Sequence, residues 1–130
     1  MANKRRDDFS KQTIEVLAKR VTYCCSNPEC RKATIGPNIN KNKATSIGVA
    51  AHIKAAAPGG PRYDKNMTSE ERSDISNGIW LCQSCSKLID ANPEKYPVDR
   101  LIEWKKLAEQ TSQRAIESDG TFNPNSIFSI

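Results

Sequence analysis

Two cysteine groups lie far apart in the chain, and their spacing is the first sign of chemistry. Cys25 and Cys30 enclose a proline, and Cys82 and Cys85 form a Cys-x-x-Cys pair. Each pair can bring two sulfur atoms within reach of one ion, and four thiolates suit tetrahedral Zn²⁺. Disulfide bonds or unrelated buried thiols are the alternatives, but disulfides are rare in the cytoplasm, where we expect this chain. The sequence therefore predicts a closed, structural zinc site.

The fifth cysteine, Cys24, directly precedes Cys25. Adjacent residues rarely both bind a metal in a closed four-coordinate site. Cys24 is therefore either left over or takes the place of Cys25 as a zinc ligand.

The only histidine, His52, is the second candidate for chemistry. A single histidine is more often an ordinary core or surface residue than a functional one. His52, however, stands near the end of the apolar segment 46–54 and is followed by a basic, glycine-rich loop, by Asn77-Gly78 and by the second cysteine pair. This setting favours a functional role.

Positive charge is concentrated in the first half of the chain. Residues 1–65 hold thirteen Lys or Arg against five Asp or Glu, whereas residues 66–130 hold seven against ten, within a net charge of +5. Such an asymmetry suits a polyanionic partner such as DNA, although a solvated basic surface is the plain alternative. The predicted DNA-binding residues are Lys41, Lys43, Lys54 and Arg62.

Short elements must position these residues. Ser10 is expected to cap a helix over residues 11–20, and segment 46–54 is expected to form a strand. Asn77-Gly78 predicts a turn into a second strand, residues 79–81, which can pair with the first. The other expectations are a knuckle and polar loop without regular structure over residues 23–42, a loop over 55–67, a capped turn at 68–71, a helix after Cys82, a helix after Pro97 and no clear element from residue 118.

These segments together resemble the HNH endonucleases, which belong to the ββα-metal nuclease group, in the zinc-ribbon form with two cysteine pairs. The resemblance covers residues 20–108 and is carried by CSNPEC, GVAAHIKAAAPGGPRYD, MTSEERSDISNGIWLCQSC and KLID. It implies an α+β fold, a small zinc-stapled ββα-metal (HNH) domain with flanking helices. The chain then divides into a basic N-terminal helix (1–22), an HNH nuclease domain with the four-cysteine zinc site (23–110) and a C-terminal tail or linker (111–130).

The resemblance also implies roles for individual residues. In such proteins the first histidine is the general base, the asparagine braces the loop that carries it, and a histidine directly after the second cysteine pair helps to hold a divalent ion. These roles fall to His52, Asn77 and position 86, with Mg²⁺ or Mn²⁺ as the catalytic ion. Hydrolysis of a phosphodiester needs a base for the attacking water and a cation for the developing charge, and a neutral imidazole can be that base.

Position 86 is a serine, so the last histidine of the motif is missing. A hydroxyl can bind Mg²⁺ but is a poorer ligand for softer metals than imidazole and has a shorter reach. Ala51 also offers no ligand at a place where many relatives have aspartate, which makes Asp64 or Asp74 the candidates for compensation. We therefore expect weakened or absent cleavage.

The sequence and this resemblance together predict a cytoplasmic, metal-dependent DNA endonuclease, and the resemblance implies a role in bacterial restriction or antiviral defence. Similar domains are frequently joined to a sensor domain or partner subunit; none is visible here, which leaves a fragment and a small stand-alone protein equally open. The oligomeric state is open, and no segment is long enough for a membrane span. The main alternative is a non-catalytic, zinc-stabilised DNA-binding module, which Ser86 favours. A zinc-ribbon module that binds protein is the third option.

Overall fold

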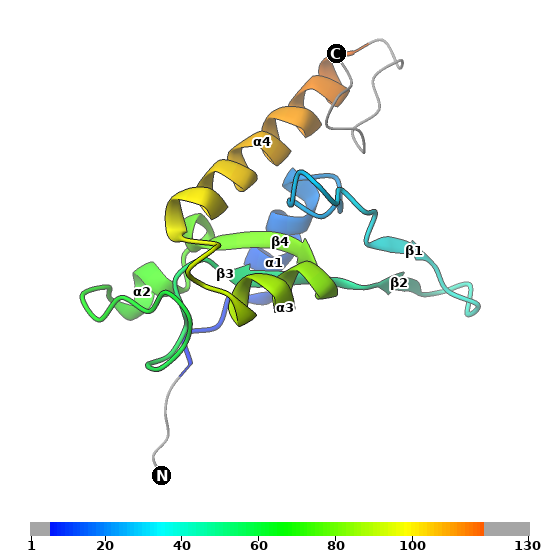
Figure 1. Ribbon diagram of the computed structural model, residues 1–130. Helices are drawn as coiled ribbons and strands as arrows, with labels where there is room; N and C mark the ends of the chain where they lie inside the picture. Colours follow the sequence, from blue (N-terminus) through cyan, green and yellow to red (C-terminus); the bar gives the residue numbers. More distant parts are fainter. Residues whose placement is uncertain (1–5, 119–130) are drawn as a thin grey trace.

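The central sheet of the molecule is formed by two antiparallel strands, as seen in the computed structural model, which describes residues 6–118 (Figure 1). Strand β3 (Gly48–His52) pairs with β4 (Gly78–Cys82), and His52 lies opposite Gly78. The predicted pairing of these two segments is therefore confirmed. With its helices, the structure is a small α+β fold, as predicted at that coarse level.

A second small sheet is a hairpin of β1 (Ile35–Pro37) and β2 (Ala44–Ser46). The hairpin extends away from the body of the molecule (Figure 1). Strand β1 falls within residues 23–42, for which the sequence predicted no regular structure. That prediction was wrong because three-residue strands, here mostly exposed, are too short to show an alternation of apolar and polar residues.

The helices begin where capping chemistry predicts. Ser10 Oγ accepts a hydrogen bond from the backbone N–H of Thr13, and Thr68 forms a capping box with Glu71. The long last helix continues to residue 117, so residues 111–117 of the predicted tail are helical, and residues 119–130 lie outside the described part. The helices are α1 (Lys11–Arg20), α2 (Ser69–Arg72), the short 3₁₀ helix η1 (Ile75–Asn77), α3 (Gln83–Ala91) and α4 (Val98–Glu117).

Strand β4 is buried along its whole length and divides the apolar interior into two parts. Because successive side chains of a strand point to opposite faces, Ile79 and Leu81 join one cluster and Trp80 joins the other. The larger cluster includes the metal-candidate cysteines and residues of α3 and α4, and the smaller one includes Ala18 of α1. The central sheet is thus covered on both faces.

The Asn77-Gly78 dipeptide does not form the predicted hairpin turn. Gly78 has extended backbone dihedrals (φ −110°, ψ 150°) and already belongs to β4. A Cβ atom at Gly78 would lie 2.5 Å from Leu17 Cδ1 and 3.0 Å from Phe9 Cζ. Glycine is required at this position because α1 and the segment before it approach the strand closely.

Within residues 6–118, the helices are all too short or too polar to cross a lipid bilayer.

Candidate metal centre and candidate active site

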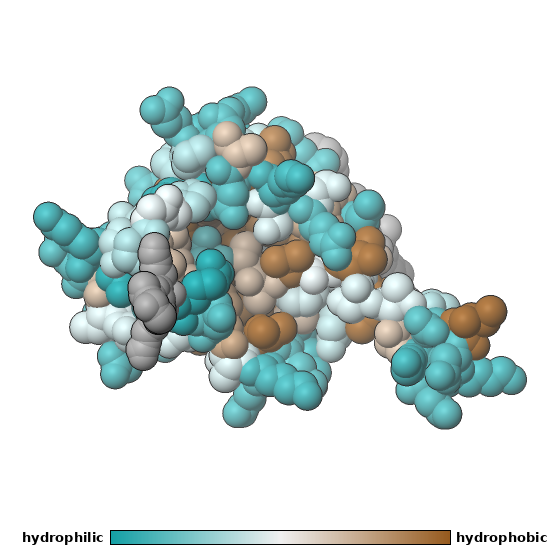
Figure 2. Space-filling view, turned by 90° about the horizontal axis from the view of Figure 1, so that it is seen from below, coloured by the Kyte–Doolittle hydropathy of each residue, from teal (hydrophilic) through white to brown (hydrophobic). Residues whose placement is uncertain are grey.

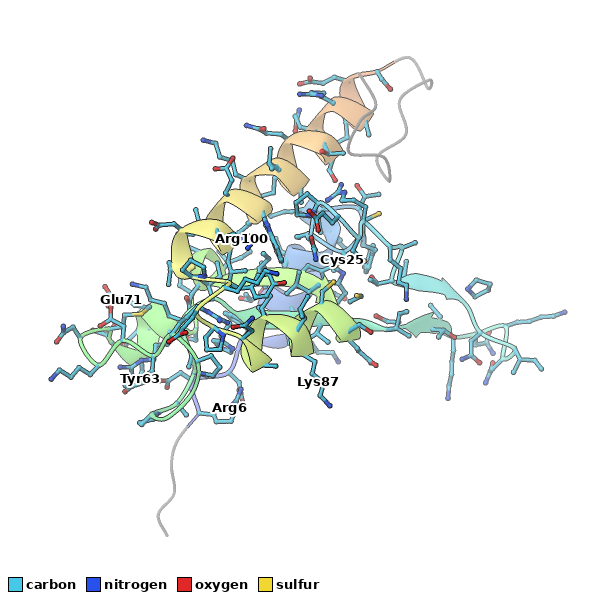
Figure 3. All side chains as sticks on the ribbon, in the orientation of Figure 1. Arg6, Cys25, Tyr63, Glu71, Lys87 and Arg100 are labelled. Atoms are coloured by element: carbon cyan, nitrogen blue, oxygen red, sulfur yellow. The ribbon has the colours of Figure 1, made fainter. Side chains whose placement is uncertain are left out.

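The four predicted zinc ligands come together, with sulfur atoms that all lie within 4.8 Å of one another. Cys30 Sγ and Cys82 Sγ are 3.9 Å apart. A tetrahedral zinc ion with Zn–S bonds of about 2.3 Å needs sulfur atoms about 3.8 Å apart, so the cluster fits the ion with little movement. Cys25 lies near the start of α3 (Figure 3), where Cys82 is the N-cap. Four cysteines can therefore hold a structural metal such as zinc.

Burial and hydrogen bonds set the protonation of these thiols. Burial raises the pKa of Cys25 and raises that of Cys85 to about 11. Burial also opposes ionisation of Cys82, but hydrogen bonds from the Cys85 backbone and the neighbouring thiols outweigh it and lower the pKa of Cys82. Asn27 Nδ2 donates to Cys85 Sγ at 3.4 Å. A bound cation would therefore favour the thiolate forms of Cys25 and Cys85, whose pKa values burial raises.

Cys24 is separate from this cluster. It forms a β-bridge with Ala33, and consecutive residues of an extended segment point to opposite faces. Cys24 Sγ donates to the Thr22 carbonyl at 3.5 Å, and burial raises its pKa. Of the two adjacent cysteines, Cys25 is the one placed for metal binding.

His52 ends β3 as a half-buried imidazole with a defined tautomer. Its Nε2 lies 2.9 Å from the backbone carbonyl oxygen of Asp7. Because a carbonyl only accepts, Nε2 carries the proton and Nδ1 keeps its lone pair. Burial lowers the pKa of His52 and outweighs the hydrogen bond to the Asp7 backbone, which raises it; the charge of Arg6 lowers the pKa further, against still smaller contributions from the charges of Asp8 and Asp7. The imidazole is therefore neutral at pH 7 and able to accept a proton at Nδ1.

Asn77 is buried beside the residues that follow His52. Its Nδ2 donates to the carbonyls of Lys54 and Arg72, at 2.9 Å each, and its Oδ1 accepts from the backbone N–H of Lys54 at 3.0 Å. The backbone of Asn77 also accepts from Ile53 N–H at 2.8 Å. These hydrogen bonds fix the chain just after His52.

A cleft of about 440 Å³ brings His52 and Ser86 together. Ser86 lies in the first half of α3, and Asp90, one helical turn later, lines the same cleft. The four-residue spacing from position 86 was the signal in the sequence that could have identified Asp90. The carboxylate of Asp90 is half exposed and accepts a hydrogen bond from Arg62 at 2.9 Å.

Asp64 is not brought into this cleft. It lines a separate hollow of about 700 Å³ together with Lys54 and the other candidate, Asp74. Its carboxylate accepts from the backbone N–H of Asn66 at 2.9 Å and from Lys54 Nζ at 3.2 Å, and these two contacts lower its pKa. The structure therefore does not support the predicted position of Asp64 beside Ser86, because local turn contacts and an ion pair hold it elsewhere.

The four predicted DNA-binding residues have different surroundings. The Arg62 side chain is only 5% exposed and donates to the carbonyls of Ile53, Ile89 and Tyr96. The prediction of a DNA contact is corrected here, since Arg62 is an internal clamp. Lys54 is half-buried and paired with Asp64, whereas Lys41 and Lys43 are fully available on the β1–β2 hairpin.

The cleft is lined by β3, by the loop over residues 55–61 and by α3, with His52 at the end of the strand and Ser86 in the helix. Asp7 and Phe9, which hold His52, were missed by sequence reasoning because no local pattern links them to it. No family model matches this chain, and no curated protein matches it.

Proposed function

We propose that the chain is a zinc-stabilised, HNH-type endonuclease domain that binds DNA and hydrolyses phosphodiester bonds. The observation that carries this proposal is the position of a neutral His52, with Nδ1 available, across one cleft from Ser86 and Asp90 of α3. Asn77 supports it by fixing the backbone after His52. The same domain would act in a bacterial restriction or antiviral defence system, together with a sensor domain or partner subunit.

In the proposed reaction, His52 Nδ1 takes a proton from a water molecule as the water oxygen forms a bond to phosphorus. The bond between phosphorus and the 3′ oxygen then breaks, and the leaving oxygen takes a proton from a second water molecule to give a 3′ hydroxyl, while His52 releases its proton to solvent. A divalent ion, when bound, stabilises the charge on the phosphate and on the leaving oxygen. Ser86 and Asp90 offer oxygen ligands, which Mg²⁺ prefers, and this ion is usually bound by one or two carboxylates and substrate phosphates.

A non-catalytic DNA-binding module is the second candidate. Ser86 is not an imidazole, and the carboxylate of Asp90 is already paired with Arg62. Both features weaken a divalent-metal site without affecting the zinc centre or the basic hairpin.

Plasmid cleavage with Mg²⁺ or Mn²⁺ distinguishes the two candidates. If the chain is a nuclease, the original chain or its Ser86→His variant should cleave the plasmid. Adding His52→Ala to whichever of the two cleaves should abolish cleavage and leave DNA binding unchanged. Cleavage that survives His52→Ala would contradict the assigned base. Stable DNA binding without cleavage by either chain would favour the non-catalytic module.

A further inference from the structure

The tip of the β1–β2 hairpin carries an apolar side chain without a packing partner. Ile39 is 101% exposed, the highest value among the large apolar residues that the structure describes. The hairpin projects from the molecule, and its mostly hydrophilic surface ends in an apolar group (Figure 2). Ile39 therefore contributes nothing to the core.

The charge around Ile39 is exclusively positive. Lys41 and Lys43 follow it in the same tip, and no Asp or Glu occurs between Glu29 and Asp64. An apolar residue among cations, without any carboxylate, suits a polyanion with apolar interior surfaces. Duplex DNA has this combination, because its phosphates surround stacked bases.

The tip is held in one conformation. Asn38 Nδ2 donates to Thr45 Oγ1 at 3.0 Å, and Asn38 Oδ1 accepts from the backbone N–H of Asn40 at 2.9 Å. Asn40 in turn accepts from the backbone N–H groups of Asn42 and Lys43, both at 3.0 Å. Ile39 is thus presented at the apex by a hydrogen-bonded turn, which reduces the entropy lost on binding.

The base of the hairpin is anchored in the core. Thr34 is fully buried, its Oγ1 accepts from Trp80 Nε1 at 3.0 Å, and it also donates to the Tyr23 carbonyl. The backbone N–H of Ile47 donates to the Thr34 carbonyl at 2.8 Å. Movement of the arm relative to the central sheet is therefore restricted.

We propose that this hairpin is a DNA-binding arm that enters a groove, with Ile39 inserted as a wedge between base pairs and Lys41 and Lys43 on the phosphates. Proteins that bend DNA commonly insert isoleucine, leucine, methionine, phenylalanine or proline in this way. The inference rests on the DNA binding in the proposed function but not on cleavage.

The arm and His52 belong to one extended stretch of chain. Strands β2 and β3 lie end to end in Figure 1, and Lys43 precedes His52 by nine positions. At a rise of about 3.3 Å per residue, these two residues are about 30 Å apart. With about 3.4 Å per base pair, a phosphate bound by Lys43 would lie about nine base pairs, or almost one helical turn, from the phosphate at His52.

The test measures the end-to-end distance of a dye-labelled duplex several helical turns long by energy transfer, in buffer without Mg²⁺ or Mn²⁺. The wild-type chain is expected to shorten this distance. Ile39→Ala is expected to abolish the bend and weaken binding about 10-fold, whereas Ile39→Leu keeps both. Ile116→Ala, which changes another highly exposed isoleucine, on α4, is the matched control and is expected to have no effect.

An unchanged bend and affinity in Ile39→Ala would overturn the proposal and leave Ile39 as a contact for another protein. A wild-type chain that does not bind duplex DNA would also overturn it. Cleavage by a wild-type chain that does not bend the duplex would contradict the proposed role of the hairpin and leave the nuclease proposal intact. A bend that depends on Ile39, in a chain that does not cleave DNA, would support the proposed role of the hairpin and contradict the nuclease proposal.

Discussion

The imidazole of His52 stacks on the ring of Phe9, with ring centroids 4.0 Å apart and ring planes 10° apart. Phe9 directly precedes the N-cap of α1. The backbone carbonyl of Asp7, two residues earlier, accepts a hydrogen bond from Nε2–H of the same histidine. The segment before α1 therefore covers one face of the imidazole and fixes its tautomer. Phe9 and Asp7 are positioning residues for the proposed base.

The first prediction concerns zinc. Cys82→Ser and Cys85→Ser are expected to unfold the domain, because structural zinc contributes about 10–16 kcal/mol in small zinc-binding domains. Circular dichroism and a measured zinc content near one ion per chain check this expectation. Cys24→Ser is the matched control and should keep its zinc, since Cys24 Sγ contacts the Thr22 carbonyl outside the cluster. Well-folded protein without zinc would disprove the structural role.

The second prediction concerns position 86. Ser86→His is expected to tighten binding of Mn²⁺ by roughly 10-fold to 100-fold, the range of affinity changes found when residues that support metal ligands are substituted. It is also expected to raise cleavage at limiting Mg²⁺ or Mn²⁺. Titration calorimetry and plasmid cleavage measure the two effects, and the melting temperature should stay nearly constant because the zinc ligands are untouched.

Ser84→His is a suitable control because it introduces the same side chain on the same helix at a position outside the cleft lining. If Ser86→His leaves metal dependence unchanged while the original chain already cleaves well, Ser86 is not a metal ligand. Asp90→Asn would then be the next variant to test.

The third prediction is a pH dependence. Burial disfavours the imidazolium form of His52, so its pKa lies below the usual 6.5 and the neutral base persists to lower pH. On acidification, the midpoint of the fall in kcat/KM for cleavage should therefore lie below pH 6.5. The acid limb of the pH profile measures this, with His52→Ala as the blank. An acid limb centred above 6.5 would contradict the assignment of the limb to His52.

The fourth prediction concerns the charge of the hairpin. Each neutralised phosphate contributes about −0.9 to the slope of log affinity against log salt, so Lys41→Gln with Lys43→Gln should reduce the slope by about 1.8. Fluorescence anisotropy over a salt series measures it. Lys106→Gln, on the exposed side of α4, is the control. An unchanged slope in the double variant would place the DNA surface elsewhere.

Arg62→Gln should behave differently from these lysine variants. Its buried guanidinium satisfies three backbone carbonyls, so the substitution is expected to lower stability by about 2 kcal/mol or more. Thermal denaturation and the anisotropy salt series distinguish a structural role of Arg62 from a DNA contact. A lower melting temperature with an unchanged salt slope identifies a structural role. A normal melting temperature with a reduced slope would restore the original assignment of Arg62 to DNA.

The sequence by itself determined the parts of this protein that depend on local chemistry. The cysteine spacing predicts the metal cluster, because two closely spaced pairs of thiols can supply the four sulfur ligands of one tetrahedral ion. Capping residues such as Ser10 and Thr68 predict where helices begin, and their hydrogen bonds are local. The apolar runs over residues 46–54 and 79–81 likewise predict the two central strands, which the structure places at Gly48–His52 and Gly78–Cys82.

Only the tertiary structure decided which of several equivalent side chains face the site. Backbone direction separates Cys25 from Cys24, and packing of a distant helix separates the buried cation Arg62 from the exposed Lys41. Asp90 lies in the cleft of His52, whereas Asp64 lies in another hollow. These outcomes depend on contacts between segments far apart in the chain, which leave no periodic pattern in the sequence from which they could be predicted.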